Sequence, residues 1–115
     1  MRKEEQDLNR ELIEYENLEK QLEVLLIQKH QLQIQSNEVK HATEELKKAD
    51  GNIYRSIGSI MMQSSKGDAE KELNERSELI KVKLGALEKQ EEKLRGIVMD
   101  RQKKIQESLK SHEKK

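Results

Sequence analysis

Two stretches of heptad-spaced leucine and isoleucine, separated by a short β-rich segment, constrain this chain more than any other feature. The apolar residues recur at alternating steps of three and four from Leu8 to Leu46 and again from Leu73 to Leu109. This spacing places them along one stripe of a helix and is typical of coiled coils. We therefore expect a mainly α fold, in which two long helices form an antiparallel coiled coil and are joined by one β-hairpin.

The predicted seam follows both arms when Leu8 is taken as heptad position a. In the first arm, position a then holds Leu8, Tyr15, Leu22, Lys29, Ser36 and Thr43, and position d holds Leu18, Leu25, Leu32, Val39 and Leu46. In the second arm, position d holds Leu73, Ile80, Leu87, Leu94 and Arg101, and position a holds Ser77, Leu84, Glu91, Val98 and Ile105. Polar residues at a restrict register and partner. Lys29 and Glu91 are similarly distant from the hairpin in sequence, so we expect them to neutralise each other.

The composition agrees with extended helices rather than with a compact globule. Charged residues make up 40% of the 115 residues, aromatic residues 2% and hydrophobic residues 32%, and proline is absent. Such a hydrophilic chain is also compatible with disorder. The regular spacing of the apolar residues decides against that alternative, because scattered apolar residues would form no seam.

The sequence lacks the residues that several classes of function require. The 23 basic and 23 acidic residues balance, so no global positive field attracts nucleic acid. The end of the chain is locally basic, and we interpret it as a solvated helix end rather than a polyanion site; its lysines are Lys103, Lys104, Lys110, Lys114 and Lys115. There is no cysteine, no His-x-x-x-His pair and no glycine-rich phosphate loop. We expect no catalysis, no metal and no cofactor.

The start of the chain also bears on location. Its first residues, Met-Arg-Lys-Glu-Glu-Gln-Asp, lack the apolar core of a signal peptide, and no apolar run reaches the length of a membrane span. We expect a cytoplasmic protein without membrane contact.

The segment between the arms predicts two strands, residues 53–57 and 60–64, joined by Gly58 and Ser59. Glycine at the first of two turn residues favours a type II′ turn. This register sets Ile57 opposite Ile60 and Arg55 opposite Met62. Residues 1–49 then form the first helix, residues 50–67 the hairpin element and residues 68–115 the second helix, all within one domain. We expect Asp68 to cap the second helix.

The predicted hairpin is too apolar to stand alone, since an isolated two-stranded hairpin is marginal in water. Two thin helices offer it little cover, and its unpaired edges favour pairing with other chains. We interpret it as an oligomerisation element, with the alternative that it folds back onto its own helices. The residues assigned to this role are Ile53, Tyr54, Ile57, Gly58, Ile60, Met61 and Met62.

From about residue 8 to residue 110, the sequence resembles the beta-type subunit of prefoldin, in an archaeal-like form. The resemblance rests on the hairpin sequence from Ile53 to Met62, on the segment from Leu87 to Leu94, and on Gln28-Lys29-His30-Gln31 in the first arm. The chain resembles the beta-type subunit in having a single predicted hairpin, whereas the alpha-type subunit has two. The acidic start of the chain departs from this family's more neutral pattern.

The resemblance implies an ATP-independent chaperone. Two alpha and four beta subunits would join their hairpins into a double β-barrel that carries six coiled-coil arms. The arm tips would capture non-native proteins and pass them to a group II chaperonin. The tip residues matched on this chain are Leu8, Leu12, Ile13, Tyr15, Ile97, Val98, Met99, Ile105 and Leu109.

Three alternatives stay open at this point. Leu12, Ile13, Ile97 and Met99 lie off the a/d seam, so they either broaden the seam or form a contact surface for clients. The chain as a whole is either a holding chaperone or a structural coiled-coil adaptor that binds one defined folded partner. Gly85 and Gly96, at outward positions of the second arm, indicate either a tolerant surface or a softened helix.

Overall fold

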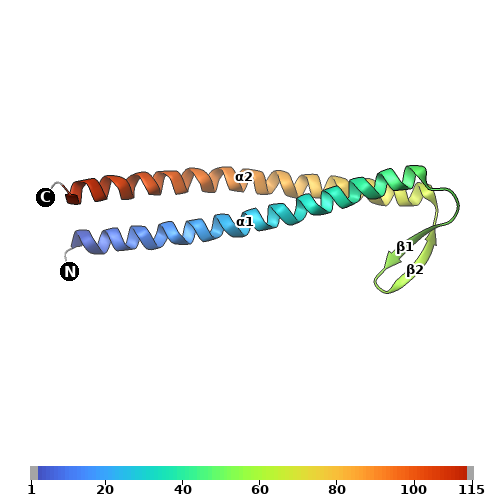
Figure 1. The fold of residues 1–115 in the computed structure, drawn as a ribbon, viewed down its shortest axis with the longest axis horizontal. Helices are drawn as coiled ribbons and strands as arrows, with labels where there is room; N and C mark the ends of the chain where they lie inside the picture. Colours follow the sequence, from blue (N-terminus) through green and yellow to red (C-terminus); the bar gives the residue numbers. More distant parts are fainter. Residues whose placement is uncertain (1–2, 114–115) are drawn as a thin grey trace. The chain divides into compact units, whose positions relative to one another are not determined.

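The computed structural model describes residues 3–113 and contains two helices and one hairpin (Figure 1). Helix α1 spans Lys3–Lys48, strands β1 and β2 span Ile53–Ile57 and Ile60–Ser64, and helix α2 spans Lys66–Glu113. The predicted order of helix, hairpin and helix is confirmed. Lys114 and Lys115, part of the basic end discussed above, lie outside the described residues.

The chain divides into two compact units. The terminal unit contains α1 up to Lys29 and α2 from Ala86 onward. The hairpin unit is continuous in sequence, from His30 to Gly85, and contains the rest of both helices together with the hairpin. Each unit therefore has its own helix pair.

The predicted seam is confirmed in both units. Every a and d residue assigned from the sequence is buried or partly buried, whereas most residues at the other heptad positions are exposed. The most buried side chains are Leu25 and Ile105 in the terminal unit, and Val39, Leu46 and Ile80 in the hairpin unit. One polar seam residue of the hairpin unit has a backbone partner: Thr43 Oγ1 donates a hydrogen bond of 2.8 Å to the carbonyl of Val39.

The helices begin and end at recognisable local signals. Helix α1 ends with Lys47 and Lys48 in its last turn, where positive charge suits the helix dipole. Gly51 follows with φ 93°, a conformation that side-chain-bearing residues rarely adopt. Lysines in the last turn and a glycine shortly after it are common signals for the end of a helix.

The cap of α2 was assigned wrongly from the sequence. Ser65, not Asp68, is the N-cap: its Oγ accepts a hydrogen bond of 3.1 Å from the Asp68 backbone N–H. The Ser65 carbonyl also accepts the first helical bond, from Ala69 N at 3.0 Å. Asp68 lies inside the first turn, where its carboxylate faces the positive end of the helix dipole.

The hairpin has the predicted register. Strands β1 and β2 are antiparallel, with Ile57 opposite Ile60, Arg55 opposite Met62 and Ile53 opposite Ser64. Gly58 has φ 60° and Ser59 does not have a positive φ, as a type II′ turn requires. Arg55 Nε pairs with Glu72 Oε2 of α2 at 2.9 Å, which ties β1 to the start of that helix.

Candidate functional site

The hairpin presents apolar side chains on both of its faces. Ile57, Ile60 and Met62 share one face by the strand alternation, and Tyr54 and Met61 share the other. All five are exposed, Met61 by 66%. In the hairpin, only Ile53 and Ser64 are partly buried. The alternative in which the hairpin folds onto its own helices is therefore not what this structure contains.

A hollow of about 780 Å³ lies between the first of these faces and the start of α2. Ile57 and Met62 line its strand side, and Asp68 and Glu72 line its helix side. The Arg55–Glu72 ion pair spans the two sides, and Arg76 Nη2 approaches the other Glu72 oxygen at 3.9 Å. The hollow offers an apolar wall with a charged edge, and it is wide enough to accept side chains from another chain.

The nine residues matched to prefoldin arm tips all belong to the terminal unit, but their exposure differs. Five have exposed side chains: Leu12, Ile13, Ile97, Met99 and Leu109. Leu8, Tyr15 and Val98 are partly buried in the seam. Ile105 is only 8% exposed, so its side chain contributes to helix pairing and is not presented to a ligand in this structure.

Two features hold the helices together near these residues. Arg101, a predicted seam residue of α2, reaches across so that its Nη1 pairs with Glu14 Oε2 of α1 at 2.9 Å. Tyr15 packs partly into the seam, and this burial, followed by the Glu19 carboxylate, raises the pKa of the Tyr15 hydroxyl. Tyr15 therefore stays uncharged. Its side chain combines an apolar ring with a hydroxyl that can form hydrogen bonds.

The acidic start of α1 affects its own seam. Glu11 occupies a d position between Leu8 and Tyr15, and its buried Oε2 has no hydrogen-bond partner within the described part of the chain. A buried oxygen without a partner costs free energy. This layer therefore contributes little to helix pairing, in contrast to the layers around Leu25.

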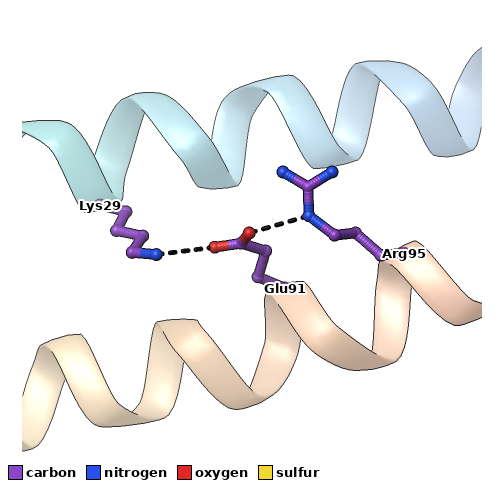
Figure 2. Close-up of polar contacts among 3 residues, drawn as sticks. All are labelled: Lys29, Glu91 and Arg95. Carbon is purple, nitrogen blue, oxygen red and sulfur yellow. Dashed lines mark hydrogen bonds and ion pairs between the residues drawn. The ribbon is translucent and has the colours of Figure 1, made fainter.

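A charged cluster crosses the seam at the predicted position (Figure 2). Lys29 Nζ of α1 donates a hydrogen bond of 3.0 Å to Glu91 Oε1 of α2, with side-chain exposures of 23% and 16%. The expected neutralisation of Lys29 by Glu91 is confirmed. Arg95, one turn further along α2, donates from Nε to Glu91 Oε2 at 2.8 Å. The hydrogen bonds from Arg95 and then from Lys29 hold the pKa of Glu91 below its ordinary value.

Sequence reasoning missed two sets of residues. Arg95 was not assigned to the charged cluster, although its i,i+4 spacing from Glu91 is a known signal for an ion pair on a helix. Sequence reasoning also missed apolar residues at the outward c and f positions, because these positions are not part of the a/d pattern. These exposed residues are Val24, Ile27, Ile34, Leu79 and Val82.

Within residues 3–113, no group of three or more histidine, aspartate and glutamate side chains is placed to hold a metal ion. Neither α1 nor α2, over the same residues, contains a stretch that is apolar enough to cross a membrane.

Comparison with known proteins points in one direction. Residues 9–113 match the model of a family described as prefoldin subunit. The chain is 34% identical over 105 residues to the prefoldin subunit beta of Saccharolobus islandicus, covering 90% of this chain and 83% of the relative. It is 33% identical over 96 residues to the prefoldin subunit beta of Archaeoglobus fulgidus, covering 82% of this chain and 83% of the relative.

A solved structure extends the similarity to the fold. The crystal structure of the prefoldin beta subunit from Thermococcus strain KS-1 superimposes with a TM-score of 0.83 at 30% identity. The match covers 90% of this chain and 92% of that one. Two long helices with one two-stranded hairpin are thus an arrangement that both chains share.

Proposed function

The chain belongs to the prefoldin subunit family and is a prefoldin chaperone subunit, and we propose that it acts as the beta-type member of a hetero-hexamer. In this proposal two alpha-type and four beta-type subunits join through their hairpins, and the far parts of the helix pairs capture non-native proteins without ATP. Captured chains are then delivered to a group II chaperonin.

The exposed hairpin supports the assembly step. Its apolar side chains project from both faces, and its two outer edges are unpaired within the described residues. Each buried side chain of this size contributes roughly 1.5–3 kcal/mol, as an upper estimate. Pairing with hairpins of other subunits would cover the side chains and satisfy the strand edges at the same time.

The observation that carries client capture is the group of exposed apolar side chains on the terminal unit. Ile13 and Met99 lie off the seam, and Met99 is 67% exposed, so neither is needed to hold the helices together. Flexible methionine and aliphatic side chains suit contacts with many different sequences. Several weak contacts on one unfolded chain add up through avidity when six subunits act together.

A double variant tests the capture surface. We expect the assembly that contains Ile13→Ser and Met99→Ser to have the mass of the unmodified assembly but to lose most of its ability to slow aggregation. Light scattering after dilution of an unrelated denatured enzyme measures this ability. Ile27→Ser and Val82→Ser, at similarly exposed positions that are not among the proposed capture residues, form the control pair.

The outcome also separates the chaperone from the structural adaptor. If the unmodified assembly leaves aggregation of several unrelated proteins unchanged and binds one folded partner instead, the adaptor is the correct function. If the double variant protects as well as the unmodified assembly, the chaperone uses another surface.

A further inference from the structure

An apolar groove lies on one flank of the helix pair in the terminal unit. Its volume is about 360 Å³. Buried Leu25 and partly buried Leu94 form its floor, and exposed Val24 and Ile97 stand at its sides. The remaining lining residues are Gln21, Gln28, Gln90 and Lys93.

The rim of this groove is unusual for a chain in which 40% of the residues are charged. Positions that flank a coiled-coil seam usually hold glutamate and lysine. In this groove the flanking positions are occupied by Gln21, Gln28 and Gln90 instead. Lys93 is the one charged residue in the described lining. The rim therefore carries one positive charge, on Lys93, and its other polar groups are neutral amides.

The three glutamines also have hydrogen-bonding capacity to spare. None of their side-chain amides makes a hydrogen bond to another residue within 3–113, and all three are exposed. Each amide offers both donor and acceptor groups. An apolar floor with neutral donors and acceptors along its edge is complementary to a peptide backbone that carries apolar side chains.

We propose that this groove binds an extended, uncharged, apolar segment of a non-native polypeptide, as a contact additional to the tip residues. The inference rests on the proposed function, since it names the kind of client segment that the terminal unit takes. An extended segment exposes backbone N–H and C=O groups that the glutamines can satisfy, whereas a helical segment has already paired its own. Ile97 belongs both to the groove and to the proposed tip set, so the two surfaces are continuous.

Peptide binding tests the groove directly. The probe is a fluorescein-labelled peptide of alternating leucine and serine flanked by glycine, and fluorescence anisotropy measures its binding to the full chain in its assembly. Val24→Glu places a carboxylate at the edge of the apolar floor, and we expect binding to weaken about tenfold. Ile27→Glu, one turn away on the same helix and 53% exposed against 55% for Val24, is the matched control and leaves binding unchanged.

A second variant tests the role of the amides. Gln28→Met keeps the length and helix preference of the side chain but removes its hydrogen-bonding groups. We expect it to weaken binding of the extended peptide by about three- to tenfold, the value of one lost hydrogen bond. Circular dichroism of each variant checks that the helices are intact. If Gln28→Met strengthens binding, or if an amphipathic helical peptide binds more tightly than the extended one, the proposed occupant is wrong.

Two further outcomes distinguish this inference from the proposed function. If the unmodified assembly slows aggregation but Val24→Glu binds the peptide normally, the groove is not a client site and the chaperone function stands. If Val24→Glu changes the mass of the assembly, the groove is a contact between subunits and the inference fails. Loss of peptide binding in an assembly of unchanged mass supports it.

Discussion

Lys29, Glu91 and Arg95 form a charged layer in a seam that is otherwise largely apolar. Glu91 accepts one hydrogen bond from each of the two cations, so both of its oxygens are used. An ion pair of this kind adds less stability than an apolar pair of the same size. Its effect is instead on register, because a shift of one helix along the other would place a lone charge against leucine.

Charge exchange tests this layer. We expect Lys29→Glu and Glu91→Lys, each alone, to lower the melting temperature by several degrees, because each places two like charges on facing helices. The double exchange restores most of the loss, although Arg95 then lies beside a second cation and limits the recovery. Thermal unfolding followed by circular dichroism measures all three variants.

Glu92→Lys is the matched control for the charge exchange, since Glu92 is exposed and adjacent in sequence but lies outside the seam. Its melting temperature should stay close to that of the unmodified chain. A double exchange that is no more stable than the single variants would show that the two residues do not interact across the seam.

At the scale of elements, the sequence predicts most of what the structure contains. The a/d positions, the strand register and the turn at Gly58 follow from periodicities and from one glycine, all of which are local signals. The start of α2 was misjudged because Ser65 and Asp68 are both good capping residues, and they lie three positions apart. Which one caps depends on backbone geometry, which residue preferences do not specify.

Replacement of glycine by alanine should have opposite effects on stability at Gly58 and at Gly96. At Gly58, φ is 60°, so Gly58→Ala strains the turn and should destabilise the hairpin by about 1–2 kcal/mol. Gly96 lies in α2 with open space around its Cβ position, so Gly96→Ala should stabilise the helix by about 0.5–1 kcal/mol. Denaturant unfolding of both variants measures the two signs.

The Gly96→Ala variant also addresses whether a softened helix assists capture. If it stabilises the chain and reduces protection of denatured proteins, the glycine is functional. If protection is unchanged, Gly96 occupies a tolerant surface position. A stabilising effect of Gly58→Ala would contradict the turn conformation described here.

At the scale of the whole molecule, the sequence identified where apolar residues are in excess but not which of them are presented. The nine tip residues were matched by position in the chain, and burial then separated Ile105 from Met99. The groove between Leu25 and Leu94 was not predicted, because it depends on how residues from two helices come together. Heptad positions of one helix alone do not reveal such a surface.

The hairpin provides the prediction that concerns the assembly. Ile60 and Met61 point to opposite faces of β2, so Ile60→Asp with Met61→Asp places a charge on each apolar face. Burial of these carboxylates between subunits would be costly. We therefore expect the assembly to dissociate into smaller species while the helix content stays unchanged, as measured by mass photometry and circular dichroism.

Val82→Asp is the control for this double variant, since Val82 is 69% exposed on α2 in the same unit and outside the hairpin. It should leave the mass unchanged. Dissociation also removes avidity, because each free subunit offers a client only its own contacts. Protection against aggregation should therefore fall in the hairpin variant, although its terminal unit is unaltered. An intact assembly that carries both aspartates would show that the subunits join through a surface other than the hairpin.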